Sequence, residues 1–246
     1  MSLINYHTSN PVFSRTLWAT SFKKSARMTL NGIFFKSFLS IVLLSSTTWY
    51  VWDLVSQGID VKWYTTGGMI AAIVFSILTS YKRTWAPITT PLYALAKGLF
   101  LGGISAYAEL QFPGLPMKAV SITILTFFVM LFLYKVHIIN VTKRFRSVVI
   151  TAAITIMFIY IIHWILTFFG LSLPFVWGTS WFAIGFNIVA AIIASLSLVL
   201  DFDFIDRKIG KAPKYYEWVA TWGLLVTLVW LYIEVLRLLK KLAIRF

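Results

Sequence analysis

Seven long apolar stretches, separated by short polar and basic segments, make up most of the chain. A helix needs about 20 apolar residues to cross a membrane, because every backbone N–H and C=O must be paired within the helix. The pattern predicts seven membrane-spanning helices, at residues 31–52, 63–81, 90–110, 115–134, 148–169, 177–200 and 216–239. We therefore predict an all-α membrane protein with one transmembrane domain over residues 29–246, preceded by a polar, basic tail over residues 1–28.

Composition supports this class. Of the 246 residues 59% are apolar or aromatic and only 12% are charged, and the mean hydropathy of +0.83 lies far from that of soluble domains. The net charge of +14 does not indicate nucleic acid, because Lys and Arg lie between the apolar stretches and not on a polar domain. The predicted partner is the lipid bilayer. The chain has no cysteine, so disulfides and thiolate metal sites are excluded.

The basic residues orient the predicted helices, since short cytoplasmic loops carry an excess of Lys and Arg. With the N-terminus in the cytoplasm, the inner segments carry Arg15, Lys23, Lys24, Arg27, Lys82, Arg83, Lys135, Lys143, Arg144, Arg146, Arg207, Lys208, Lys211 and Lys214. The outer loops carry only Lys62 and Lys118. The C-terminal cations from Arg237 to Arg245 break the rule. Either packing holds the last helix against its charges, which we favour, or this helix does not cross completely.

Small residues recur at helical spacing in two predicted spans. Ala94, Gly98, Gly102 and Ala106 are four residues apart, a spacing that lets two membrane helices approach closely. A second stripe contains Asn187, Ala190, Ala194, Ser197 and Asp201, and lies on one face of the sixth span. We expect Asp201, at the end of this stripe, to face the helix bundle.

Catalytic chemistry is not predicted. The three histidines, His7, His137 and His163, do not form a metal-ligand pair. Nucleophile, phosphate-loop and dinucleotide motifs are absent from the sequence. We predict a protein that is not an enzyme, with no cofactor and no structural metal.

Ionisable residues in membrane spans are costly and mark functional positions. Lys36 near a span end, and Glu234 one turn before Arg237, have structural explanations. The candidates for gating or pH sensing are Asp201, Glu217, Lys97 and Arg83, and those for ion contact are Asp201, Asp203 and Glu109.

Asp201 is the strongest candidate. Asp203 and Asp206 are rotated away from it and lie beside Arg207 in a basic inner loop, where cations are ready partners. Burial disfavours the charged form of a carboxylate, so Asp201 is expected to respond to pH if it closes a gate with Lys82 or Arg83. Its oxygens also suit Ca²⁺.

Three segments of the chain carry a resemblance to a known family. "SNPVFSR", "PLYALAKGLFLGGISAYAE" and "LVLDFDFIDRKIGKAPKYYEWVATWGLLVTLVWLYIEVLRLL" resemble the Bax inhibitor-like, or YccA-type, membrane proteins, specifically a bacterial branch. The resemblance implies a seven-helix bundle with the last helix near its centre. It also implies relatives that are pH-sensitive Ca²⁺ leak channels or regulators of membrane proteolysis and cell death.

The family gate consists of two aspartates on the last two helices with an arginine partner. Asp201 matches the first aspartate. The second falls at about Val226, beside Thr227, and Glu217 lies nine residues earlier. Lys97 stands where relatives carry an acid, so a contact of Lys97 with Asp201 or Glu109 is an alternative to the two-carboxylate gate.

The leading functional hypothesis is a pH-sensitive cation leak, with Ca²⁺ as the transported ion, in the bacterial inner membrane. Asp201 is the inner gate in this hypothesis. The alternative is a non-conducting membrane regulator that binds a quality-control protease or another membrane protein through its basic tail and loops.

Overall fold

The computed structural model describes residues 27–171, 173 and 178–245; the predicted tail lies outside the described residues up to residue 26. The described part contains seven long helices and no β-strand: α2 (Leu30–Ser56), α3 (Lys62–Tyr81), α4 (Ala86–Gln111), α5 (Leu115–Lys135), α6 (Lys143–Phe168), α8 (Trp181–Lys208) and α9 (Tyr216–Arg245). A short 3₁₀ helix, η2 (Arg83–Trp85), joins α3 to α4. The predicted all-α class is confirmed.

Six of these helices are long and apolar enough to cross a membrane, namely α2, α3, α5, α6, α8 and α9. A multi-pass membrane protein is therefore confirmed. Helix α4, the predicted third span, is not among the six. It has 26 residues, includes Lys97 and Glu109, and buries residues along most of its length against other helices.

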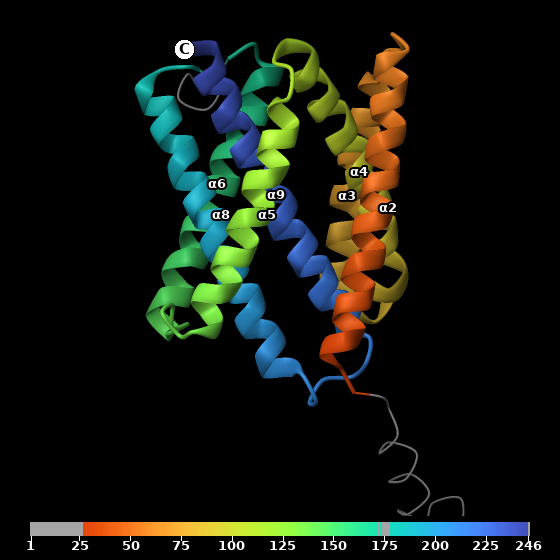
Figure 1. The fold of residues 1–246 in the computed structure, drawn as a ribbon, viewed down its shortest axis with the longest axis vertical. Helices are drawn as coiled ribbons and strands as arrows, with labels where there is room; N and C mark the ends of the chain where they lie inside the picture. The colour runs from red at the N-terminus through yellow and green to blue at the C-terminus, as the bar shows by residue number, and fades with distance from the viewer. Residues whose placement is uncertain (1–26, 172, 174–177, 246) are drawn as a thin grey trace, which may run out of the picture.

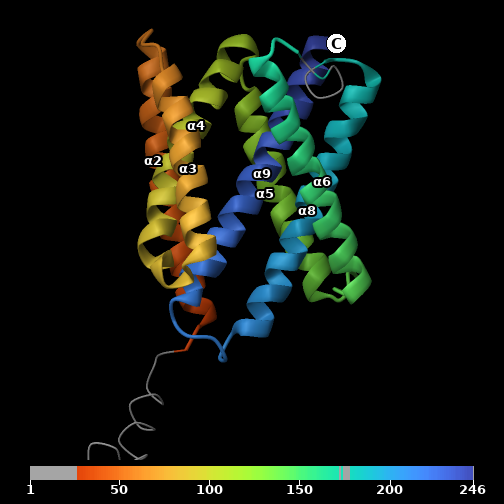
Figure 2. The same cartoon turned by 180° about the vertical axis from the view of Figure 1, so that it is seen from behind.

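The helices form two groups (Figures 1 and 2), with α2, α3 and α4 on one side and α5, α6 and α8 on the other. Helix α9 contacts α2 and α4 of the first group and α5 and α8 of the second. In the most apolar window of α9, 61% of the residues are buried, compared with 11% in α2. Most side chains of α2 thus face outward, and in a bilayer these apolar side chains would contact lipid.

The predicted small-residue stripe of α4 lies against α2. A Cβ added to Gly102 would come within 2.7 Å of the Thr48 carbonyl oxygen, so only glycine permits this approach. The close contact also brings polar groups together, because Thr47 Oγ1 donates to the Leu95 carbonyl at 3.0 Å and Thr48 Oγ1 donates to the Gly98 carbonyl at 3.1 Å. The predicted packing role of this stripe is confirmed.

Helix α8 differs from the predicted sixth span at both ends. It begins at Trp181, where Ser180 Oγ caps the helix by accepting from Ala183 N–H; Trp177, the predicted start, lies outside the described residues. It continues to Lys208, so the predicted loop position of Asp203 and Asp206 is wrong. The Arg207 Nε–H donates to Asp203 Oδ1 at 2.9 Å, and this pair one turn apart stabilises the additional turns.

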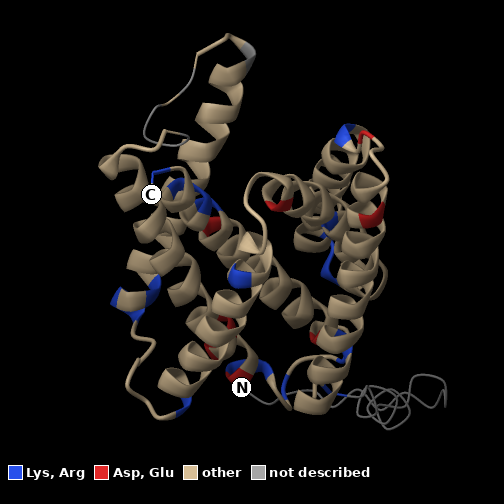
Figure 3. Ribbon diagram, turned by 45° about the horizontal axis from the view of Figure 1, so that its top comes forward, with Lys and Arg blue, Asp and Glu red and all other residues tan. Residues whose placement is uncertain are grey.

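Lys and Arg lie at both ends of the helix bundle (Figure 3), and more of them lie at one end than at the other. We call one end the basic end: it comprises the start of α2, the α3–α4 turn, the α5–α6 loop and the α8–α9 loop. Its cations are Arg27, Lys82, Arg83, Lys135, Lys143, Arg144, Arg146, Arg207, Lys208, Lys211 and Lys214. The opposite end comprises the α2–α3 loop, the α4–α5 turn, the start of α8 and the end of α9.

Candidate functional site

A cavity of about 220 Å³ lies at the basic end between α3, α8 and α9. We call it the Asp201 cavity. Its walls are formed by Thr79, Ser80, Arg83, Asp201, Phe204, Val219, Ala220, Trp222 and Gly223. The volume exceeds that of several water molecules, so the cavity leaves room for water next to the Asp201 carboxylate.

Asp201 is held by a single side chain of the last helix. Thr227 Oγ1 donates to Asp201 Oδ2 at 2.6 Å. The other carboxylate oxygen, Oδ1, has no hydrogen-bond partner in the described part of the chain. The expectation that Asp201 faces the helix bundle is confirmed, and its partner is the hydroxyl beside the position where the family's second aspartate falls.

Arg83, the predicted cationic partner, lines the same cavity. Its guanidinium Nη1 donates to Tyr216 Oη at 3.3 Å, and within residues 27–171 and 178–245 no ion pair joins it to Asp201. Trp222 lines the cavity as well, and its buried indole N–H has no hydrogen-bond partner there. A carboxyl group and a guanidinium therefore share one cavity without direct contact.

Glu217 lies away from this cavity, at the junction between α2 and α9. Its side chain is 0% exposed and forms an ion pair with Lys36, at 2.5 Å between Nζ and Oε2. The Thr29 N–H and Thr29 Oγ1 both donate to Glu217 Oε1 at 2.9 Å. Gly32 makes room for the carboxylate. The sequence suggested a gating role for Glu217, but its contacts join two helices.

Lys97 and Glu109, both on α4, do not meet each other or Asp201. Lys97 Nζ lies 4.9 Å from the centre of the Phe100 ring, and the described residues place no carboxylate at ion-pair distance from it. Glu109 accepts from the Gly114 N–H at 2.9 Å and so stabilises the turn that leads into α5. The alternative contact of Lys97 with Asp201 or Glu109 is absent among the described residues.

Asp203 and Asp206 have the cationic partners that their surroundings predict. Asp203 forms ion pairs with Arg146 of α6 and with Arg207. Asp206 lies 3.3 Å from Lys135 of α5. These contacts hold α5 and α6 to the end of α8. Because two arginines already neutralise the Asp203 carboxylate, it is poorly suited to bind a metal ion.

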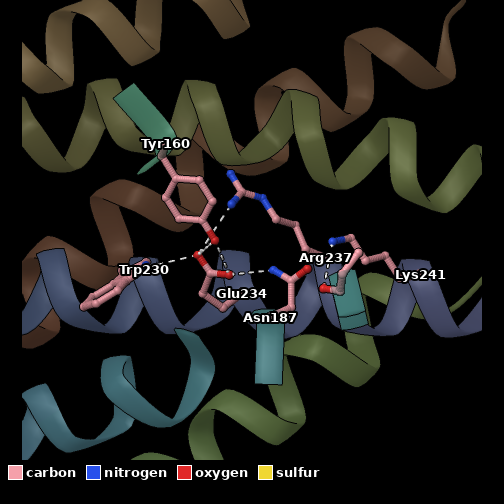
Figure 4. Close-up of polar contacts among 7 residues, drawn as sticks. Tyr160, Asn187, Trp230, Glu234, Arg237 and Lys241 are labelled. Atoms are coloured by element: carbon pink, nitrogen blue, oxygen red, sulfur yellow. Dashed lines mark hydrogen bonds and ion pairs between the residues drawn. The ribbon is translucent and has the colours of Figure 1, made fainter. Parts of the chain in front are cut away.

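A cluster of polar side chains surrounds the buried carboxylate of Glu234 (Figure 4). Glu234 lies in the C-terminal half of α9, and so toward the opposite end of the bundle. Glu234 is 0% exposed. It accepts hydrogen bonds from Tyr160 Oη at 2.8 Å, Asn187 Nδ2 at 2.9 Å and Trp230 Nε1 at 3.1 Å. Arg237 Nη1 lies 3.5 Å from Glu234 Oε1, which confirms the predicted pair.

The number of side chains that contact Glu234 was not predicted from the sequence. Asn187 had a signal, because it belongs to the small-residue stripe of α8. Tyr160 had none, since α6 is apolar all round and one tyrosine does not reveal which helix it faces. A glutamate within an apolar span indicates that polar partners lie nearby. The pairing with Arg237, one turn away, was sufficient to explain Glu234, so no further partners were predicted.

Comparison with known proteins identifies the family. Neither the curated proteins nor the solved structures gave a match. A family model described as Bax inhibitor 1 like matches residues 10–244, which includes all seven described helices except the last residue of α9. The resemblance that the sequence motifs indicated is thereby confirmed. The chain belongs to the Bax inhibitor 1 like family.

Proposed function

We propose that this protein allows slow, pH-dependent passage of cations across the bacterial inner membrane, and that Asp201 closes the path at the basic end. The observation that carries the proposal is the position of Asp201 on a cavity between three helices, with Oδ1 free of partners among the described residues and Oδ2 bound by Thr227 at 2.6 Å. A carboxylate oxygen on such a cavity suits Ca²⁺, which prefers oxygen ligands.

The proposed topology has seven spans, with α4 as the third and α9 as the central helix. The contacts of α9 with both helix groups support this arrangement. The cations of the basic end support a cytoplasmic position for that end and for the N-terminus. Single cysteines in place of Lys211 and Asp60 test it in intact cells: an impermeant maleimide should label the Asp60 position only.

The proposed effect of pH follows from charge. When Asp201 is ionised, it attracts Arg83 across the cavity and accepts from Thr227, which holds α3, α8 and α9 together. Protonation removes the charge and weakens both interactions. Mild acidification is therefore expected to open the path.

Flux of Ca²⁺ into liposomes that contain the purified protein tests the proposal. The expected result is faster flux under mildly acidic than under mildly basic conditions. In Asp201→Asn, flux should be fast under both conditions. Background flux under both conditions in the wild type would disprove conduction.

A second candidate is a non-conducting regulator that binds a quality-control protease or another membrane protein. One observation favours it: the partner of Asp201 on α9 is the neutral Thr227, so Asp201 is the one acid among the residues that line the cavity. A single acid attracts a cation less strongly than a pair of acids. In that case the basic tail and loops form the contact surface, and removal of residues 1–25 should abolish co-purification with the partner. Neither candidate is enzymatic.

A further inference from the structure

The Glu234 cluster connects three helices that are distant in sequence. Tyr160 lies on α6, Asn187 on α8, and Trp230, Glu234 and Arg237 on α9. Helix α6 packs against α8, and the Tyr160 hydroxyl of α6 also donates a hydrogen bond to Glu234 of α9 at 2.8 Å. The Arg237 guanidinium also lies over the Tyr160 ring, 4.5 Å from its centre. Tyr160 is thus a polar tether between α6 and α9.

Glu234 and Thr227 lie on the same face of α9, because seven residues make about two helical turns and about 10 Å of rise. Asn187 and Asp201, in turn, belong to the same stripe of α8. Between these polar positions lie buried apolar side chains, among them Leu198, which is 0% exposed, and Leu231, which is 1% exposed. The Ser197 hydroxyl also lies in this interval, and it donates to the Ile193 carbonyl of its own helix at 2.9 Å. The contacts between α8 and α9 therefore have a polar site on each side of a mainly apolar layer.

The charges around Glu234 oppose a passing cation. Arg237 pairs with the carboxylate, and Lys241 Nζ donates to the Ala183 carbonyl of α8 at 3.2 Å. Four donors already occupy the Glu234 oxygens, so the carboxylate offers little to an ion while the helices stay together. A cation that moved between α8 and α9 from Asp201 toward the opposite end would meet these contacts.

We propose that the Glu234 cluster is a latch that fastens α6 and α8 to α9, and that it closes the bundle a second time on the side away from Asp201. The closing role rests on the proposed cation passage; the fastening role does not. Release of the latch should separate α6 from α9, and in a conducting protein it should increase flux.

The mildest variant is Tyr160→Phe, which removes only the hydroxyl that donates to Glu234 and keeps the ring beneath Arg237. Glu234→Gln removes the charge. The control is Tyr232→Phe, because Tyr232 lies on α9, is buried, and forms a 2.7 Å hydrogen bond with Ser105 outside the cluster. Each tyrosine variant loses one hydroxyl group that forms a hydrogen bond between helices, with Glu234 in one case and with Ser105 in the other.

The first measurement is a distance between spin labels, which the absence of cysteine in the chain makes simple. Labels on cysteines at Ile162 of α6 and Ile244 of α9, both exposed, report the separation of these helices by pulsed electron paramagnetic resonance. We expect longer and broader distances in Tyr160→Phe than in the wild type, and an unchanged distribution in Tyr232→Phe. Unchanged distances in both Tyr160→Phe and Glu234→Gln would overturn the latch.

The second measurement is Ca²⁺ flux in liposomes. Tyr160→Phe should increase flux about fivefold, since loss of one hydrogen bond shifts a two-state equilibrium by about this factor, while the pH dependence set by Asp201 remains. Wild-type flux in Tyr160→Phe, in a protein that does conduct, would overturn the closing role. If the wild type does not conduct but the labels separate, the proposed function fails and the latch stands.

Discussion

Thr227 on α9 donates its hydroxyl to the carboxylate of Asp201 on α8, with 2.6 Å between Thr227 Oγ1 and Asp201 Oδ2. The hydroxyl also lies 3.1 Å from the Gly223 and Leu224 carbonyl oxygens of its own helix. A hydroxyl has one proton, so donation to Asp201 competes with donation to these carbonyls. Ionised Asp201 is the strongest of the three acceptors, and the contact between α8 and α9 therefore depends on its charge.

Replacement of Thr227 separates the role of its hydroxyl from that of its shape. Thr227→Val keeps the volume and removes the donor, so we expect higher flux under mildly basic conditions and a smaller difference between acidic and basic conditions. Thr227→Ser retains the donor and should behave as the wild type. Equal flux in Thr227→Val and Thr227→Ser would show that the hydrogen bond to Asp201 does not hold the path closed.

The close approach of α4 to α2 should tolerate no additional methyl group. A Cβ on Gly102 would lie 2.8 Å from Val51 Cβ and 2.7 Å from the Thr48 carbonyl oxygen, so Gly102→Ala is expected to lower the free energy of unfolding by about 2 kcal/mol. Gly67 on α3 faces open space, and Gly67→Ala should be neutral or slightly stabilising. Thermal unfolding in detergent compares the two; similar stability would contradict the packing that we describe.

The repeating residues made this part of the fold predictable. Apolar length located the spans, and four small residues at a spacing of four identified the packing face of α4. The course of the chain beyond Leu200 was not predictable in the same way, because the sequence after it is acidic and basic. It remains helical through Lys208 because Asp203 and Arg207 pair along the helix while Arg146 approaches from α6.

Of the candidate site, Asp201 and Arg83 were predictable from the sequence, whereas Thr227 was not. Asp201 was identified from its own helix, since its stripe of small residues lies within one element. Its partner Thr227, and the contacts of Tyr160 with Glu234, depend on how α6, α8 and α9 meet. The periodicity of apolar residues does not predict how membrane helices meet, because lipid and protein offer similar surroundings to apolar side chains.

Loss of one partner of the buried ion pair between Lys36 and Glu217 should be strongly destabilising. Glu217 is 0% exposed, so Lys36→Met leaves an uncompensated buried charge, and we expect the free energy of unfolding to fall by about 3 kcal/mol. The control is Lys62→Met, which breaks the exposed pair with Asp60 and should change stability by less than about 1 kcal/mol. Thermal unfolding measures both, and an equal effect of the two variants would refute this assignment.

Asp60 in the α2–α3 loop gives a pH dependence of known sign. The Lys62 backbone N–H donates to Asp60 Oδ1 at 3.0 Å, and this hydrogen bond lowers the pKa of Asp60 below its ordinary value. The stabilisation is therefore present above the unfolded-state pKa of about 3.9 and is lost as the pH falls through the lower folded-state value. Between neutral and strongly acidic pH, the melting temperature should fall more in the wild type than in Asp60→Asn. An equal fall would contradict the role of this hydrogen bond.

The central claim is that the charge of Asp201 closes a path for cations, and a pH titration of Ca²⁺ flux in liposomes tests it most directly. The comparison includes Asp201→Asn and the control Asp206→Asn, which removes an exposed carboxylate of the same helix, paired with Lys135. We predict that flux rises on acidification in the wild type and in Asp206→Asn, and that it is fast and independent of pH in Asp201→Asn. A wild-type pH profile in Asp201→Asn would contradict the account.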